Sequence, residues 1–352
     1  MRIILFPLSP VYRFLIWLRN WLFNRGYFRA VKVDKTVISI GNITVGGSGK
    51  TPAVNLLANI IKNSGRKTGV LSRGYGRRSK GYLLISDGMS IKTDPTTAGD
   101  EIYLTAAECG VAAAVCERRV EGARKFIQDA NPDVIVLDDA FQHRWIYRDL
   151  DILIFDQNFL SRPGGMDQNL LPVGVMREPF KSLKRADAVI INRKFSDFTF
   201  LPVPLRPYFE GKKIFTGFYK TSGIFDVKNH KSYDLCEFEG QRSLVVSGIA
   251  FPASFLNVLS QNNINTENQL LFTDHKDYGQ KDIQEIRKKF YSTNSHSVIT
   301  TQKDAVKLSV FSKDLDDIDI YYLKIELEID QKVEFNRFIL DKLDVLCKKS
   351  GI

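Results

Sequence analysis

The sequence contains few cysteines, and no two of them are close together. The four are Cys109, Cys116, Cys236 and Cys347, with no C-x-x-C pair and no spacing typical of metal ligands. Internal repeats and low-complexity segments are absent as well. This pattern argues against a disulfide framework. It predicts buried or idle thiols in a reducing compartment, for which the cytosol is the default.

A long uncharged run is also missing. The first thirty residues are rich in Phe, Trp and Leu, but Pro7, Pro10, Arg13 and Arg19 interrupt them. A membrane-spanning helix needs about 20 mostly uncharged residues, and a signal peptide needs a small-residue cleavage site, which does not follow here. We therefore expect this segment neither to span a membrane nor to be removed.

The same segment has the pattern of an amphipathic helix. From Ser9 onward, helical periodicity places a few polar residues on one narrow face, while Leu15, Leu18, Trp21 and Leu22 belong to the broad apolar remainder. Such a helix can lie in the headgroup region of a bilayer, or it can cover the globular core. The sequence leaves both interpretations open, and residues 1–30 are predicted to be a separate N-terminal unit.

Runs of basic residues are absent, although the chain is basic overall. Its formal net charge is +10, yet it has no continuous stretch of Lys or Arg and no glycine–arginine tract. The excess charge predicts an anionic partner. Nucleic acid, a phosphorylated ligand and an acidic membrane surface all remain possible from charge alone.

Length and element order predict two domains. A chain of 352 residues is too long for one compact core of ordinary size. Strands and helices alternate as far as the proline-rich stretch LPVPLRPYFEGKK, which suggests a boundary. We therefore expect a larger α/β domain over residues 31–205. A smaller C-terminal α/β domain is expected over residues 206–352, with a closing helix around 332–347.

The most informative stretch is VISIGNITVGGSGKTPAVNLLANII, residues 37–61. It begins with β-branched residues typical of a strand, passes through a glycine-rich turn and continues with apolar residues at helical spacing. That order is typical of a P-loop, in which backbone N–H groups and a helix N-terminus attract phosphate. Lys50 is expected to reach the β- and γ-phosphates, and the Thr51 hydroxyl to ligate Mg²⁺.

The P-loop pattern is not strict. Thr44 occupies the position of its first glycine, so Gly46 and Gly47 have to supply the flexibility. A strand–turn–helix with incidental glycines is the alternative interpretation. The predicted nucleotide-binding residues of the loop are Thr44, Val45, Gly46, Gly47, Ser48, Gly49, Lys50 and Thr51.

Two further segments contribute carboxylates. The run DVIVLDD, residues 133–139, resembles a Walker B strand, and it ends in Asp138 and Asp139. At the carboxyl end of a parallel strand these side chains can hold the magnesium opposite Thr51. Asp100 precedes a helical run and could be catalytic, or it could simply favour the helix N-terminus.

Ten motifs in order resemble the tetraacyldisaccharide 4'-kinase family. They are GNITVGGSGKTP (41–52), LSRGYGR (71–77), GDE (99–101), RRVEGA (118–123), DVIVLDDAFQHR (133–144), DLDILIFD (149–156), LLPVGVMREP (170–179), RADAVIINR (185–193), TDHKDY (273–278) and TTQKDAVKL (300–308). The resemblance covers nearly the whole chain. It implies a P-loop NTPase-type α/β fold, mostly parallel, with a smaller C-terminal α/β lobe and an N-terminal amphipathic helix.

The resemblance also implies an activity and residue roles. Members use ATP and Mg²⁺ to phosphorylate the 4'-hydroxyl of a tetraacylated glucosamine disaccharide 1-phosphate in lipid A biosynthesis. They do so as peripheral, monotopic proteins at the cytoplasmic face of the inner membrane. By this resemblance Asp100 is the base and His275 its partner, Gln142 and Arg177 lie at the nucleotide, and Glu178 joins the magnesium ligands. The expected partners are the lipid substrate and an anionic membrane surface, with no nucleic acid and no obligate protein partner.

Three rival interpretations remain. A membrane-recruited ATPase switch would carry a lysine where this chain has Val45. A GTPase would have N-K-x-D or T-K-x-D, whereas the nearest string, TQKD at 301–304, has its lysine one place late. A soluble kinase for a small metabolite would leave the amphipathic N-terminus without a purpose.

Overall fold

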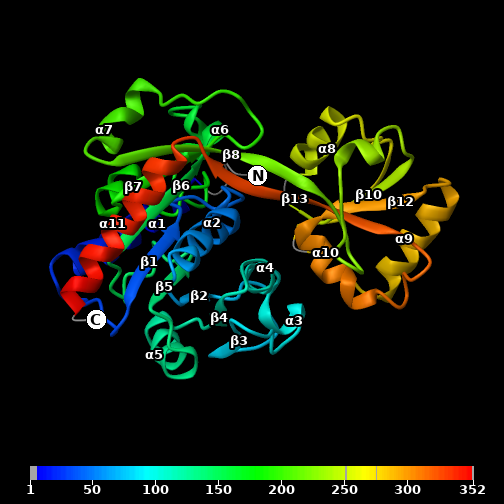
Figure 1. Cartoon of the computed structure of the whole chain (residues 1–352). Coiled ribbons are helices and arrows are strands. Elements are labelled where there is room, and N and C mark those ends of the chain that lie inside the picture. The colour runs from blue at the N-terminus through cyan, green and yellow to red at the C-terminus, as the bar shows by residue number, and fades with distance from the viewer. Residues whose placement is uncertain (1–5, 250–251, 275, 351–352) are drawn as a thin grey trace.

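The two lobes of the molecule share one continuous sheet (Figure 1). The structure is a computed structural model, and it describes residues 6–249, 252–274 and 276–350. Within these residues the sheet has thirteen strands and runs from one lobe into the other. The mostly parallel α/β fold that the sequence predicted is confirmed.

The larger lobe contains the central, parallel part of the sheet. In spatial order its strands are β7 (Ala188–Asn192), β6 (Leu150–Asp156), β1 (Thr36–Gly41), β5 (Val134–Asp138), β2 (Thr68–Ser72), β4 (Ala112–Val115) and β3 (Leu83–Asp87). All neighbours are parallel except β4 and β3. The chain passes to opposite sides of β1, so a ligand crevice is expected at the carboxyl end of this strand.

Helices cover both faces of this part of the sheet. On one face α2 (Lys50–Asn63), α4 (Asp100–Cys109) and α11 (Lys332–Ser350) share a core with β1. On the other face α5 (Arg119–Ala130) packs against β2 and β4. Shorter elements are α3 (Pro95–Ala98), α6 (Gln157–Leu160), α7 (Arg206–Phe209), η2 (Met166–Gln168), η3 (Phe180–Arg185) and η4 (Val203–Leu205). Because both faces are covered, β1, β2, β4 and β5 are buried along their whole length.

Two long antiparallel strands join the lobes. Residues at the start of β8 (Lys213–Asp226) pair with β7, and residues at the start of β13 (Ile320–Ile329) pair with β12 (Ser297–Thr301) in the second lobe. The two strands pair with each other from Asp226–Tyr321 to Gly217–Ile329. This strand pair is the only stretch drawn between the lobes in the upper part of Figure 1.

The second lobe is a smaller α/β unit, as predicted. Its strands β11 (Asn268–Leu271), β10 (Ser243–Ser247) and β12 are parallel. The accompanying elements are α8 (Pro252–Gln261), α9 (Gln280–Ser292), α10 (Gln302–Leu308), η5 (Leu235–Phe238), η6 (Ser309–Phe311) and the short β9 (Ser232–Tyr233). Its cores are separate from that of the larger lobe.

The closing helix does not belong to the second lobe. Phe335, Ile339 and Leu343 of α11 are fully buried in the core that α2 and β1 form. The physical reason is that β13 runs antiparallel to β8 and returns the chain to the larger lobe. A boundary at residue 205 therefore misplaces this helix, and it also assigns to the second lobe the start of β8, which pairs with β7 of the larger lobe.

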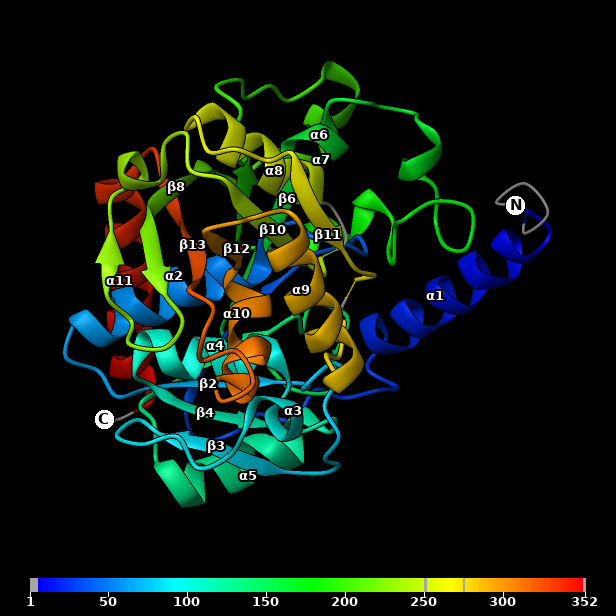
Figure 2. The ribbon, with the colours of Figure 1, turned by 90° about the vertical axis from the view of Figure 1, so that its right-hand side faces the viewer.

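The N-terminal helix α1 (Leu8–Asn24) projects from the larger lobe (Figure 2). None of its residues is buried, but one side of the helix contacts the larger lobe: Tyr12 packs against a core cluster, and Arg19 and Asn20 bond the buried Glu178. Leu8, Val11, Phe14, Leu15 and Trp17 are each more than half exposed. Among the described residues, no helix has both the length and the apolar character needed to cross a bilayer.

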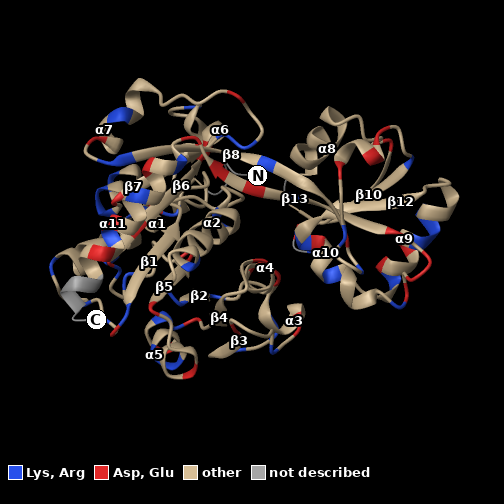
Figure 3. Ribbon diagram, viewed as in Figure 1, with Lys and Arg blue, Asp and Glu red and all other residues tan. Residues whose placement is uncertain are grey.

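Charged residues are spread over both lobes. Figure 3 shows Lys and Arg interspersed with Asp and Glu on most helices and loops. The net charge of +10 is therefore distributed over the molecule, in agreement with the lack of basic runs in the sequence.

Candidate active site

The phosphate loop lies between β1 and α2, and its glycines are structurally required. Gly46 and Gly49 have φ angles of 105° and 97°, in the left-handed region that favours glycine. A Cβ atom at Gly49 would lie 2.5 Å from both Asn192 Nδ2 and Tyr219 Oη. These glycines are therefore not incidental to a plain strand–turn–helix.

Lys50 and Thr51 are the first two residues of α2. The N-cap residue, Gly49, has no side chain with which to cap the helix, so the first backbone N–H groups of α2 can bind an anion. The Lys50 ammonium lies 3.9 Å from the Asp139 carboxylate, and Thr51 is buried. A polyphosphate would be attracted to this helix end by charge and by backbone donors together.

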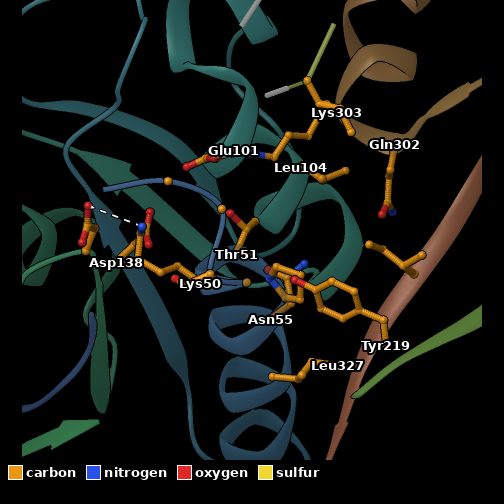
Figure 4. A pocket seen from close by; sticks show the side chains of 18 of the residues that line it. Lys50, Thr51, Asn55, Glu101, Leu104, Asp138, Tyr219, Gln302, Lys303 and Leu327 are labelled. Carbon is orange, nitrogen blue, oxygen red and sulfur yellow. Dashed lines mark hydrogen bonds and ion pairs between the residues drawn. The ribbon is translucent and has the colours of Figure 1, made fainter. Parts of the chain in front are cut away.

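A cavity of about 970 Å³ opens over the phosphate loop. Both lobes line it: the loop, α2 and α4 on one side, and α8, α10 and β13 on the other. Figure 4 shows Lys50, Thr51 and Asp138 in the larger lobe, with Gln302 and Lys303 across the cavity. The size suits a nucleotide-sized ligand, and the position means that the second lobe closes the site.

Asp138 ends β5 at the floor of the cavity. Its Oδ2 accepts a hydrogen bond from Ser72 Oγ at 3.0 Å, while its Oδ1 is buried and has no hydrogen-bond partner among the described residues. Burial, with the nearby charges of Glu101 and Asp139, raises the pKa of Asp138 to about 6. A buried carboxylate oxygen without a partner suits a cation.

Asp139 has a different environment from that of its neighbour. Its backbone is left-handed, with φ of 48°, and its two oxygens accept bonds from Arg177 at 3.0 and 2.7 Å. Burial would raise the pKa of Asp139, but Lys50 and Arg177 outweigh that effect and lower it. Asp139 is therefore ionised at neutral pH and ties Arg177 and Lys50 to the site.

Further basic groups surround the two carboxylates. Arg119, at the start of α5, is buried and donates to the backbone oxygens of Cys116 and Asp138. Burial lowers the pKa of Arg119 to about 10. Burial also lowers the pKa of His143, to about 4, and the nearby charges of Arg119 and two other arginines contribute to that shift. At neutral pH the cavity is therefore lined by a charged arginine beside Asp138 and by an uncharged imidazole.

The acidic face of α4 meets lysines of the second lobe. The Asp100 carboxylate lies 3.0 Å from Lys307 Nζ, and Glu101 forms an ion pair with Lys303, which Figure 4 shows reaching toward it. Of the two neighbouring carboxylates, Glu101 is among the described residues that line the cavity and Asp100 is not. These two pairs hold α10 against α4.

Comparison with known proteins agrees with this geometry. Residues 1–344 match the family described as tetraacyldisaccharide-1-P 4'-kinase (LpxK). The chain is 33% identical to the tetraacyldisaccharide 4'-kinase of Syntrophus aciditrophicus, over 95% of this chain and 91% of that protein. The chain belongs to the tetraacyldisaccharide 4'-kinase family.

Other relatives support the same assignment. The corresponding enzyme of Aquifex aeolicus is 32% identical, over 94% of this chain and 96% of that one. A crystal structure of LpxK from Aquifex aeolicus in complex with ATP superposes with a TM-score of 0.80, covering 97% of this chain and 99% of that chain at 30% identity. The family resemblance predicted from the motifs is confirmed, and the protein is a kinase.

The family motifs place Gln142 and Arg177 close to the phosphate loop but behind it. Gln142 Nε2 and Arg177 both donate to the backbone oxygen of Asn42, at 2.8 and 2.9 Å. Both side chains also line the cavity. They brace the base of the loop, and their predicted contact with nucleotide remains a prediction.

Glu178 is not placed as a magnesium ligand. It is fully buried and does not line the cavity, and its two oxygens are taken by Arg19 at 2.8 Å and by Asn20 and Arg185 at 3.0 and 2.9 Å. The prediction followed from its place in the REP motif beside Arg177. This arrangement does not match the prediction, because both carboxylate oxygens of Glu178 are already engaged by side chains. Across the described residues, no group of three or more His, Cys, Asp or Glu could hold a metal.

His275 lies outside the described residues. Its neighbour Asp274 lines the cavity from the second lobe. The prediction that His275 assists Asp100 therefore stays a prediction.

Sequence reasoning missed several residues at the loop. Asn192 ends β7 and donates to the Ser48 backbone oxygen at 3.2 Å, and Tyr219 of β8 packs over Gly49. A polar residue at the end of a buried strand was the available signal for Asn192. Nothing local marked Tyr219, because β8 reaches the loop only through its pairing with β7 and β13.

The pKa of Asp138 gives a stability test. Because it is raised from 3.8 to about 6, the ionised side chain destabilises the fold, and the cost grows between about pH 4 and pH 6 and is complete above it. Asp138→Asn should therefore raise the melting temperature of the nucleotide-free protein at pH 7–8, with the gain shrinking toward pH 4. Melting curves of both proteins across this range measure it. A gain that does not change with pH would contradict the assignment.

Proposed function

We propose that this chain transfers the γ-phosphoryl group of ATP to the 4'-hydroxyl of a tetraacylated glucosamine disaccharide 1-phosphate. The observation that carries the proposal is the convergence of a phosphate loop and a buried carboxylate with an unpartnered oxygen in one interlobe cavity. The identity of the acceptor substrate is inferred from membership of the kinase family. The reaction forms a bond from the 4'-oxygen to phosphorus, breaks the bond to ADP, and releases the hydroxyl proton.

The phosphate loop and Lys50 neutralise the triphosphate. Backbone N–H groups at the start of α2 point toward the cavity, and the Lys50 side chain reaches the Asp139 side of it. Phosphoryl transfer depends mostly on positioning and charge neutralisation. Arg119, charged at neutral pH and buried beside Asp138, adds a fixed positive charge near the transferring group.

The residues present also fit a magnesium ion. Mg²⁺ is usually held by one or two protein ligands, together with waters and substrate phosphates. Thr51, at the start of α2, and the unpartnered Oδ1 of Asp138 provide such ligands. When bound, the ion supplies charge neutralisation at the β- and γ-phosphates. Asp139 stays engaged with Arg177 and orients it.

Asp100 is proposed to accept the hydroxyl proton. It is buried at the N-terminus of α4, and Lys307 Nζ lies 3.0 Å from its carboxylate. An ionised carboxylate within reach of the acceptor can act as general base. Lys307 belongs to the second lobe, so the base is set in place by the contact between the lobes.

The acceptor and α1 suggest a membrane location. The polar residues Arg19, Asn20 and Asn24 of α1 face the protein. Several of its large apolar side chains, Phe14 and Trp17 among them, are more than half exposed. Large exposed apolar faces mark interaction surfaces, and a lipid acceptor makes a bilayer the fitting partner. We propose that α1 lies on the anionic cytoplasmic surface of the inner membrane, as a peripheral element.

Transfer of labelled γ-phosphate tests the function directly. The acylated disaccharide 1-phosphate is expected to be phosphorylated at the 4'-position, and its unacylated counterpart to be a much poorer substrate, because the acyl chains hold the acceptor at the surface where α1 lies. Efficient phosphorylation of small soluble sugars with no preference for the acylated acceptor would contradict the proposal.

The double variant Phe14→Ser/Trp17→Ser tests the membrane surface. Both side chains are more than half exposed, so the change leaves the polar contacts of α1 intact. Burying each in lipid is worth about 1.5–3 kcal/mol, so vesicle binding should weaken by about 100-fold or more, since roughly 1.4 kcal/mol is a factor of ten. The KM for a long-chain acceptor should rise while the KM for ATP stays unchanged.

Vesicle co-sedimentation with anionic lipid measures the binding. Val310→Ser is the matched control, because Val310 is 56% exposed on the second lobe, as Trp17 is on α1. It should pellet with vesicles like the wild type. Equal pelleting of the double variant would exclude α1 as the membrane-contacting surface.

A further inference from the structure

Helix α1 is fixed to the larger lobe by a buried ionic cluster. Glu178 is fully buried, and its carboxylate accepts bonds from Arg19 at 2.8 Å, Asn20 at 3.0 Å and Arg185 at 2.9 Å. Burial would raise the pKa of Glu178, but Arg185 and Arg19 outweigh it and lower it. Glu178 is therefore a buried charge, and two of the side chains that bond it, Arg19 and Asn20, come from α1.

The residue before Glu178 faces the nucleotide site. Arg177 binds both oxygens of Asp139 and the backbone oxygen of Asn42, and its own N–H donates to the backbone oxygen of Ile43 at 2.6 Å. Tyr12 of α1 donates to the Arg177 backbone oxygen at 3.1 Å. Residues 177 and 178 therefore touch α1 on one side and the phosphate loop on the other.

A second contact joins α1 to the loop that follows Asp139. Arg144 donates to the Asn20 backbone oxygen at 3.2 Å and to Asn24 Oδ1 at 2.9 Å. The same loop carries Gln142, which holds the Asn42 backbone oxygen. Two separate segments that brace the phosphate loop are thus both attached to the polar face of α1.

We propose that Glu178 is a positioning residue, which anchors α1 and thereby holds Arg177 in register with Asp139 and the phosphate loop. The inference rests on the proposed kinase function and extends it: the helix proposed to contact the membrane also helps to position residues of the nucleotide site. A docked α1 keeps the 177–178 segment in place. A released α1 takes away the Arg19 and Asn20 contacts of a buried charge, and the segment moves to rehydrate Glu178.

The test compares two arginines of the N-terminal region. Arg19→Gln removes one partner of Glu178, whereas Arg29→Gln removes the same charge from an exposed position beyond α1. Both are assayed with detergent-dispersed acceptor, so that vesicle binding plays no part. Arg19→Gln should lower kcat by about tenfold and weaken ATP–Mg²⁺ binding by a similar factor, which corresponds to about 1.4 kcal/mol in each case.

The KM for the dispersed acceptor should stay unchanged in Arg19→Gln, because the acceptor site is not part of the anchor. Arg19→Lys, which keeps a charge opposite Glu178, should restore part of the loss. Asn20→Ala removes a neutral contact to the same carboxylate and should act in the same direction as Arg19→Gln. It keeps the test decisive if Arg19→Gln does not fold.

Three outcomes would overturn the proposal. One is wild-type kcat and ATP affinity in both Arg19→Gln and Asn20→Ala. Another is an equal loss in Arg19→Gln and Arg29→Gln, and the third is a loss confined to vesicle binding. The ATP-binding measurement needs no acceptor, so it separates this proposal from the kinase function: absence of transfer by the wild type would refute the function alone.

Discussion

Replacing Lys50 with alanine is expected to reduce phosphoryl transfer by roughly 10²–10³-fold, the usual cost of losing one charge-stabilising group. Lys50 is the cation nearest the phosphate loop, at the first position of α2, and its ammonium lies 3.9 Å from Asp139. Its charge is needed most when negative charge shifts between the β- and γ-phosphates. The loss should therefore appear mainly in kcat.

The measurement is steady-state transfer of labelled phosphate, with a melting curve on the same sample. Lys288→Ala is the matched control, because Lys288 is exposed on α9 of the second lobe. It should keep wild-type turnover. If folded Lys50→Ala retained more than about a tenth of wild-type kcat, against the 10²–10³-fold loss expected for such a group, Lys50 would not contact the transferring phosphate.

The features that the sequence could predict are local ones. The β1–loop–α2 unit and the buried strand that ends in Asp138 each depend on residues within about 25 positions of one another. Their sequence patterns can therefore be recognised without knowledge of the long-range contacts. Their positions in the structure differ from the predicted ones by only one or two residues at each end. The sequence also predicted that Asp138 lies at the carboxyl end of this strand, as it does.

The features that could not be predicted depend on contacts between distant segments. Glu178 is 159 residues from Arg19, and no pattern within the REP motif shows that α1 returns to cover it. Helix α11 looks like the end of the second lobe until the antiparallel pairing of β13 with β8 is known. Strand pairing and helix docking are decided by the whole fold, so such errors fall where segments far apart in the sequence meet.

The site also differs from the motif prediction in how it divides its carboxylates. Asp138 and Asp139 are adjacent in sequence and were both predicted to bind the metal. In the structure Asp138 is buried with one free oxygen, while both oxygens of Asp139 are held by Arg177. The left-handed backbone at Asp139 turns its side chain toward Arg177. Opposite shifts in pKa follow, upward for Asp138 and downward for Asp139, and such a division is typical of paired carboxylates with separate roles.

Asp100→Asn is expected to lower kcat by roughly 10²–10⁴-fold, the range typical of a general base, with little change in the affinity for ATP. Asp100 is 7% exposed at the start of α4, and Lys307 of the second lobe lies 3.0 Å from its carboxylate. The amide keeps the shape of the side chain but cannot accept a proton. Binding of ATP should persist because Asp100 is not among the described residues that line the cavity over the phosphate loop.

Glu101→Gln is the matched control for this prediction. Glu101 is the next residue, also pairs with a lysine of α10, and does line the cavity. If Asp100 is the base, Glu101→Gln should cost far less, because it loses one ion pair between the lobes and no proton acceptor. The comparison is made from kcat at saturating ATP, with ATP binding measured on the same samples. A larger loss in Glu101→Gln than in Asp100→Asn would transfer the role of base to Glu101, the carboxylate that already faces the cavity.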